Sequence, residues 1–155
     1  MFFSLIGWLF ALSPEVIRES MAHALGLTFR ILKLRMEVVK TNLAIAFPEG
    51  MPEARARRKV IMREAYVNLG RLTLELMMLF GAMKWFVKNK CVLHGKEHWE
   101  KAASLGRGVI FLSSHLGNWE LMAATGRLQG IDIMLVTKHL KPEWLHEGVE
   151  KGRLS

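Results

Sequence analysis

The sequence contains only one cysteine, Cys91, among its 155 residues. A single cysteine excludes an internal disulfide framework and any zinc site built from several thiolates. The histidines show no metal-ligand spacing either, so the sequence predicts no metal site and implies no metal or redox cofactor. We therefore expect the chemistry of this protein to rest on ordinary acid–base side chains.

Long apolar runs are also lacking. The apolar N-terminal segment "MFFSLIGWLFAL" (residues 1–12) carries no charge but is only twelve residues long, whereas a membrane-spanning helix needs roughly 20 apolar residues. The segment has neither the positive start nor the small-residue end of a cleavable signal peptide. Trp8 among Phe and Leu is typical of a helix that lies in the membrane interface, and a buried helix of the domain core is the alternative.

Acidic residues are scarce compared with basic ones. There are 22 Lys and Arg against 14 Asp and Glu, which gives a net charge of +8. A surface of this sign attracts anionic lipid, nucleic acid or an acidic carrier protein. No glycine-aromatic RNA-binding motif is present, and the aromatic residues are not interleaved with the basic ones, so we expect no nucleic-acid partner.

The first half of the chain has a helical pattern. Ser13-Pro14-Glu15 predicts a helix start, and Pro52-Glu53 opens the longest expected helix. Along that helix apolar residues recur every three or four positions and predict one buried stripe. Its members are Ile61, Ala65, Leu69, Leu72, Leu76 and Leu79.

From residue 90 onward, strand and helix patterns alternate. Apolar segments at 91–95, 108–114 ("GVIFLSS") and 131–137 ("IDIMLVT") predict strands, and helices are expected between them. This alternation predicts an α/β fold, in which crossover helices connect a small parallel β-sheet and an N-terminal helical layer covers it.

One histidine and one carboxylate flank the end of the second of these strands. His115 follows the segment 108–114 directly, at the carboxyl end where open α/β sheets bind ligands. Gly117 can adopt a left-handed backbone conformation and Asn118 is a favoured helix cap, so a helix is predicted to begin between His115 and Glu120. Glu120 would then lie in the first helical turn, where the helix dipole favours its ionised form.

Such a pair suits general-base catalysis. A carboxylate beside an imidazole fixes its tautomer and raises its basicity, and a reference pKa of ~6.5 suits removal of a hydroxyl proton at neutral pH. The sequence has no G-x-S-x-G nucleophile elbow, which favours direct transfer over a covalent intermediate. The alternative is that His115 and Glu120 only complete a turn.

The residues around this pair carry a family resemblance. "HLGNWE" after an apolar strand, preceded by "NLAIAFPEG" (42–50), "NLGRLTLE" (68–75) and "VLHGKEHWEKA" (92–102), resembles the lipid A biosynthesis acyltransferases, the lauroyl and myristoyl transferases of Gram-negative bacteria. The His-x4-acid box is shared with all glycerolipid acyltransferases, and the extended pattern is more specific. Family members continue beyond this point, so the resemblance implies the N-terminal portion of such a protein.

The resemblance implies a function and a site. His115 would be the general base and Glu120 its partner in moving a fatty acyl chain from an acyl-carrier-protein thioester, a co-substrate, to a hydroxyl of a lipid A precursor or another glycolipid. Substrate-binding residues would be Gly117, Asn118, Arg127 and Lys138. Helix N–H groups near Asn118 would stabilise the thioester oxyanion.

It also implies a location and a domain division. Residues 1–50 would be N-terminal membrane-interface helices and residues 51–155 the acyltransferase core, incomplete at its C-terminus. The chain would bind an anionic membrane surface, the cytoplasmic face of the inner membrane, through its apolar N-terminal segment. Two alternatives stay open: a non-catalytic membrane-surface module that binds lipid, and a related acyltransferase with a different glycolipid acceptor.

Overall fold

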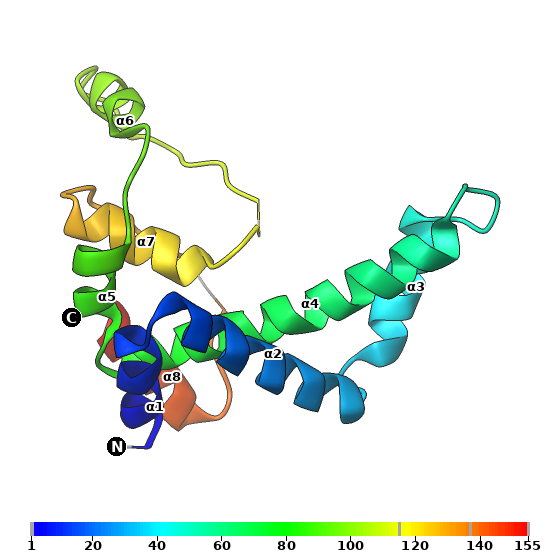
Figure 1. Cartoon of the computed structure of the whole chain (residues 1–155). Helices are drawn as coiled ribbons and strands as arrows, with labels where there is room; N and C mark the ends of the chain where they lie inside the picture. Colours follow the sequence, from blue (N-terminus) through cyan, green and yellow to red (C-terminus); the bar gives the residue numbers. More distant parts are fainter. Residues whose placement is uncertain (1, 115, 137, 155) are drawn as a thin grey trace. The chain divides into compact units, whose positions relative to one another are not determined.

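The computed structural model describes residues 2–114, 116–136 and 138–154 (Figure 1). Helices account for every regular element in these residues. In chain order they are α1 (Phe2–Leu12), α2 (Glu15–Ile31), α3 (Met36–Ala46), α4 (Ala54–Met77), the 3-10 helix η1 (Met78–Phe80), α5 (Met83–Lys90), α6 (Lys96–Ala103), α7 (Trp119–Leu128) and α8 (Glu143–Leu154).

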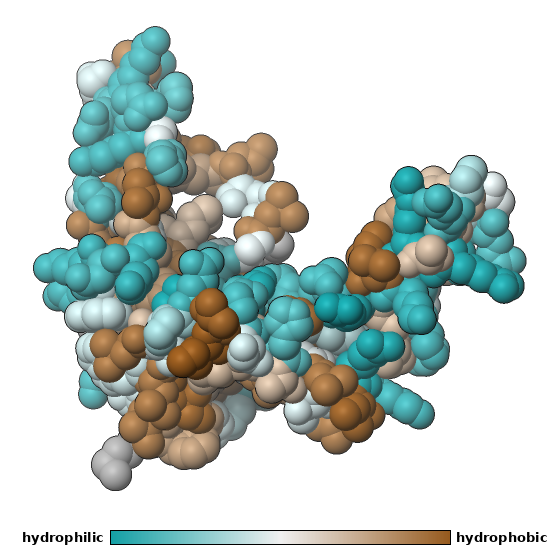
Figure 2. All heavy atoms as spheres, viewed as in Figure 1, coloured by the Kyte–Doolittle hydropathy of each residue, from teal (hydrophilic) through white to brown (hydrophobic). Residues whose placement is uncertain are grey.

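The predicted α/β fold with a parallel sheet is wrong, because no strand forms in the part of the chain that the structure describes. Residues 107–114 and 131–136 instead run as irregular loops. In the first of these loops apolar side chains face solvent: Ile110 is 95% exposed and Leu112 100%, and hydrophobic residues are visible along it in Figure 2. In the second loop Ile131 is buried. A β-rich sequence forms a strand only when a neighbouring strand accepts and donates its backbone hydrogen bonds, and these segments have no such neighbour among the described residues.

The chain divides into two compact units. Unit 1 comprises residues 1–12 and 75–155, and unit 2 comprises residues 13–74. The boundary predicted at residue 50 falls inside unit 2. A division based on composition cannot anticipate this arrangement, because the first helix of the chain packs against residues more than 60 positions later in the sequence.

The core of unit 1 lies around η1. Helices α1 and α8 both pack against η1, and α5 packs against α1, η1 and α7. Met78 is fully buried, and the strongly buried apolar side chains of this core include Phe10, Leu79, Met83, Phe86, Val87 and Val149. Helix α7, which carries Glu120, is therefore fixed to the core through α5.

Helix α1 belongs to this core, and its placement corrects the predicted location. Gly7, Phe10 and Ala11 are buried, and Phe3 stacks on Trp144 with ring centroids 5.3 Å apart. The prediction that the apolar N-terminal segment binds the chain to the cytoplasmic face of the inner membrane is wrong, because that segment buries a face within unit 1. Among the described residues, none of the helices combines the length and apolarity needed to cross a bilayer.

In unit 2, α2 approaches α4 at two glycines. A Cβ atom at Gly70 would lie 2.4 Å from the Ala22 carbonyl oxygen, and one at Gly26 would lie 2.5 Å from the Tyr66 carbonyl oxygen. On α4 the buried residues are Ala54, Tyr66, Val67, Gly70 and Leu74. The predicted stripe is therefore displaced around the helix, since its members Ile61 and Leu69 are each 37% exposed. The close contact at Gly26 and Gly70 therefore determines which side of α4 packs against α2.

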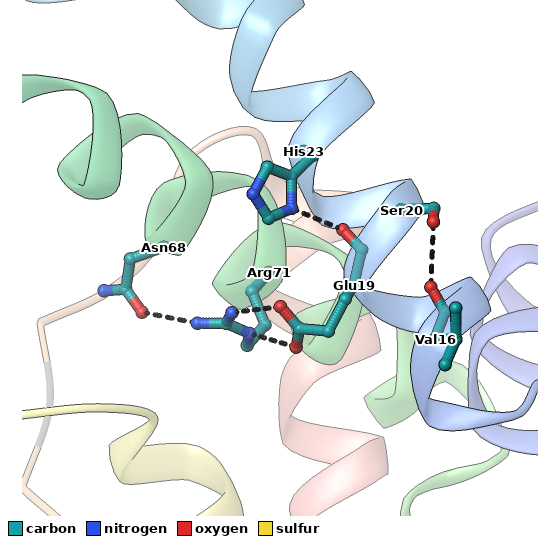
Figure 3. A network of polar contacts seen from close by, with 6 residues as sticks. All are labelled: Val16, Glu19, Ser20, His23, Asn68 and Arg71. Carbon is teal, nitrogen blue, oxygen red and sulfur yellow. Dashed lines mark hydrogen bonds and ion pairs between the residues drawn. The ribbon is translucent and has the colours of Figure 1, made fainter.

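Polar contacts also join α2 to α4 (Figure 3). Arg71 donates to both carboxylate oxygens of Glu19, from Nε at 3.1 Å and from Nη2 at 2.6 Å, and its Nη1 donates to Asn68 Oδ1 at 3.4 Å. The hydrogen bond from Arg71 holds the pKa of Glu19 below its usual value of 4.5. Tyr66 separately donates its hydroxyl hydrogen to the Leu34 carbonyl oxygen at 2.8 Å.

The Glu19–Arg71 pair predicts a specific acid sensitivity. A carboxyl group whose pKa is lowered by folding stabilises the folded state above its unfolded pKa, and that contribution disappears as the pH falls. We expect Glu19→Gln to be less stable than the wild type at pH 7 and to lose less stability between pH 6 and pH 3. Urea unfolding at several pH values measures this difference. Parallel stability curves for the two proteins would contradict it, and Glu37→Gln, at an exposed i,i+3 pair with Lys40, is the control.

Candidate functional site

The start of α7 is built as the sequence predicts. Gly117 has a φ of +72°, a conformation that favours glycine, and Asn118 is the N-cap residue. The Asn118 Oδ1 atom accepts hydrogen bonds from the backbone N–H of Glu120 at 3.0 Å and of Leu121 at 3.1 Å. The helix therefore begins between His115 and Glu120. His115 itself lies outside the described residues, so its predicted contact with Glu120 stays a prediction.

Glu120 is buried and its carboxylate is bound by an arginine from α8. It is 4% exposed, and Arg153 donates from Nε to its Oε2 at 2.8 Å and from Nη2 to its Oε1. This two-point contact with the Glu120 carboxylate raises the pKa of Arg153. The carboxylate predicted to orient a base is thus held rigidly within the core.

Further contacts fix Arg153 in this position. Its guanidinium carbon lies 5.4 Å from the ring centroid of Trp119, a cation–π distance. Its backbone carbonyl oxygen accepts a hydrogen bond from Arg127 Nη1 at 2.9 Å. Two neighbours on α7 therefore hold the end of α8 beside Glu120.

The amide nitrogen of Asn118 has a partner on a different helix. Its Nδ2 atom donates to Glu75 Oε2, on α4, at 2.8 Å. The Asn118 side chain therefore joins the first turn of α7 to α4 within unit 1, because its oxygen binds the former and its nitrogen the latter.

A cleft opens beside the ion pair. It has a volume of about 250 Å³, and four of its lining residues are charged: Glu120, Arg127, Glu150 and Arg153. The remaining lining residues are apolar: Leu79, Ala123, Ala124, Ile133 and Leu135. An apolar wall next to two arginines suits a ligand with a hydrocarbon part and an anionic or polar part.

The predicted substrate-binding residues are only partly brought together. Arg127 lines the cleft, and Asn118 and Gly117 form the turn before α7. Lys138 is exposed and does not line the cleft. The backbone N–H groups of Glu120 and Leu121, near Asn118, are the ones predicted to stabilise an oxyanion, but they already donate to the Asn118 side chain.

Sequence reasoning missed the two residues that support this turn. These residues are Arg153 and Glu75. Arg153 is 33 positions from Glu120, and Glu75 is 43 positions from Asn118. No periodicity or spacing rule connects residues so far apart. The local signal that could have helped is the acid-to-basic gradient of residues 143–154, which favours a helix ending near Arg153.

The single cysteine does not offer a nucleophile here. Cys91 follows α5, and burial raises the pKa of its thiol, with the negative charge of Glu75 acting in the same direction. A thiol of raised pKa is protonated at neutral pH and is a poor nucleophile. The site therefore favours acid–base chemistry over an acyl-cysteine intermediate.

Comparison with known proteins identifies the class. The chain belongs to the bacterial lipid A biosynthesis acyltransferase family, whose model matches residues 1–155. This confirms the resemblance predicted from "HLGNWE" and its companion segments.

A curated relative is the lipid A biosynthesis lauroyltransferase of Escherichia coli (strain K12). The two sequences are 26% identical over 146 residues, which cover 89% of this chain and 45% of the relative. The chain thus spans less than half the length of the curated relative that it matches. No solved structure matches the chain significantly.

Proposed function

We propose that this chain provides the acid–base part of an acyltransferase that moves a fatty acyl group to a hydroxyl of a lipid A precursor. Family membership supports the reaction class and the acceptor. The observation that carries the proposal is the buried Glu120 carboxylate, held by Arg153 in the first turn of a helix that begins two residues earlier at its Asn118 cap.

The proposed reaction needs a base for the acceptor alcohol. His115 removes the hydroxyl proton as the acceptor oxygen attacks the carbonyl carbon of the acyl thioester. The carbon–sulfur bond then breaks, and the imidazolium returns the proton to the departing sulfur. Glu120 orients the imidazole and stabilises its protonated form, as a carboxylate does beside any catalytic histidine.

Arg153 fixes the orientation of the Glu120 carboxylate in the proposed mechanism. Its guanidinium occupies one edge of the carboxylate with two hydrogen bonds. A carboxylate has about four lone-pair positions, so the outer positions remain available to accept an N–H from His115.

The proposed acyl donor is a thioester of an acidic carrier protein. A group of basic residues on the first half of α4 supports this choice, and its exposed members are Arg55, Arg57, Lys59 and Arg63. Figure 2 shows hydrophilic side chains gathered over this end of α4, beside α3. The predicted binding to an anionic membrane surface rests on the same charge and stays a prediction.

Replacing the base tests the proposal. The wild type and His115→Ala would be supplied with lauroyl- or myristoyl-carrier protein and a lipid A precursor, and product would be quantified by mass spectrometry. We expect at least about a 100-fold lower rate for His115→Ala, the usual contribution of a general base. His98→Ala is the matched control, because the His98 side chain is 85% exposed and lies outside the cleft.

Two outcomes would contradict the proposal. Equal rates for the wild type and His115→Ala would remove His115 from the mechanism. Binding of the lipid precursor with no transfer by the wild type would instead favour a non-catalytic lipid-binding module.

A further inference from the structure

Both polar atoms of the Asn118 side-chain amide form hydrogen bonds. Its oxygen accepts the N–H groups of Glu120 and Leu121, and its nitrogen donates to Glu75. An amide can be turned by 180° about its last bond, and the turned form would place N–H donors against the N–H groups of α7. If the group next to the Asn118 nitrogen can only accept hydrogen bonds, the amide is stable only with its nitrogen toward that group. Its oxygen then faces α7 and caps the helix.

Glu75 is such a partner. An ionised carboxylate has no hydrogen to donate, so it pairs only with the nitrogen end of the Asn118 amide. Glu75 is half-buried near the end of α4, where the chain continues directly into η1, the centre of the core of unit 1. It is therefore anchored independently of the loop before α7.

The effect of Glu75 on Cys91 supports the same placement. Burial raises the pKa of the Cys91 thiol most, and the nearby negative charge of Glu75 raises it further. The Glu75 carboxylate thus lies where α4, the end of α5 and α7 come together.

We propose that Glu75 is a positioning residue, which orients the Asn118 amide and so fixes the turn between His115 and Glu120. Its catalytic consequence rests on the function proposed above. Glu75 does not line the cleft that contains Glu120 and Arg153, so its proposed effect on the site runs through Asn118.

Reversing the polarity of the hydrogen bond tests this proposal. Asn118→Asp keeps an oxygen cap on α7, since Asp and Asn are equally good N-caps, but it places a second carboxylate against Glu75. Two adjacent carboxylates repel each other only when both are ionised. We expect Asn118→Asp to lower Tm by about 5 °C at pH 7 and to leave it nearly unchanged at pH 4.

The double variant Glu75→Gln with Asn118→Asp is expected to restore a hydrogen bond between positions 75 and 118, with donor and acceptor exchanged. The glutamine amide introduced at position 75 can donate a hydrogen to the carboxylate at position 118, and that carboxylate can still accept from α7. We expect the double variant to recover most of the lost Tm at pH 7. The matched control combines Asn118→Asp with Glu64→Gln, an exposed residue of the same helix that pairs with Arg63, and we expect no recovery.

Acyl transfer provides a second readout. Glu75→Leu leaves the Asn118 amide without its acceptor, and we expect kcat to fall about 10-fold with KM changed less than about 2-fold, because a small misplacement of reacting groups affects the chemical step. We expect Glu64→Leu to match the wild type, and the double variant Glu75→Gln with Asn118→Asp to regain most of the kcat that Asn118→Asp loses.

The reactivity of Cys91 provides a third readout that needs no enzymatic activity. Glu75→Gln removes the charge that raises the pKa of the thiol, so we expect faster alkylation of Cys91 by iodoacetamide at pH 8 than in the wild type or in Glu64→Gln. An unchanged rate would contradict the placement of the Glu75 charge.

The outcomes separate this proposal from the proposed function. If Asn118→Asp loses the same Tm at pH 4 and pH 7, or if Glu75→Gln and Glu64→Gln restore it equally, Glu75 does not orient Asn118. If the Tm and alkylation results hold while the wild type transfers no acyl group, the positioning role stands and the proposed function fails.

Discussion

Replacing Arg153 with alanine is expected to lower the free energy of unfolding of unit 1 by about 4 kcal/mol, because it leaves the buried charge of Glu120 without a partner. The Glu120 side chain is only 5% exposed and the Arg153 side chain 17%, so the pair is largely shielded from water in the folded state. Guanidinium unfolding followed by tryptophan fluorescence measures the effect, and Trp119, 5.4 Å from the guanidinium carbon, reports on this site directly.

A neighbouring arginine provides the control for this prediction. Arg127 is exposed and makes one hydrogen bond to the backbone of Arg153, so Arg127→Ala should cost no more than about 1 kcal/mol. Replacing both Glu120 and Arg153 with leucine should restore much of the stability, since apolar pairs often substitute for buried ion pairs. Equal losses for Arg153→Ala and Arg127→Ala would show that Glu120 is not buried against Arg153 in solution.

Gly70→Ala is expected to destabilise unit 2 by about 3 kcal/mol, because overpacking a close helix contact forces the two backbones apart. The new methyl group would lie 2.4 Å from the Ala22 carbonyl oxygen and 2.8 Å from the Gly26 nitrogen. These are backbone atoms of α2, so no side-chain rotation relieves the contact. The loss should exceed the roughly 1 kcal/mol by which alanine is the better helix former.

Urea unfolding followed by circular dichroism at 222 nm measures this loss. Gly50→Ala is the matched control, since nothing lies within 4 Å of a Cβ atom there, and its stability should stay within about 0.5 kcal/mol of the wild type. A Gly70→Ala protein as stable as Gly50→Ala would mean that α2 and α4 do not meet at Gly70.

The sequence was most reliable where structure depends on adjacent residues. Pro14 precedes α2, and Gly117 with Asn118 starts α7, both as predicted. These features are local, because a cap or a left-handed glycine acts on the N–H groups of the next turn.

Predictions from the sequence were wrong where a secondary-structure element depends on a partner far away in the chain. Residues 108–114 and 131–137 have strand-like composition, yet the described residues among them lie in irregular loops. Strand propensity expresses how a segment fits beside another strand, and such a neighbour is not visible in composition. The predicted membrane role of residues 1–12 failed for a related reason, since an apolar helix can bury its face against protein as well as lipid.

By itself the sequence determined the family, the start of α7 and the position of Glu120 in its first turn, because each depends on a short run of neighbouring residues. Only the tertiary structure decided which groups bind the ends of that turn. Arg153 reaches Glu120, and Glu75 reaches Asn118, because packing around η1 brings α4, α7 and α8 together. Contacts between charged residues on distant helices follow from that packing. The packing in turn depends on all the buried side chains of the core, which no short segment of sequence specifies.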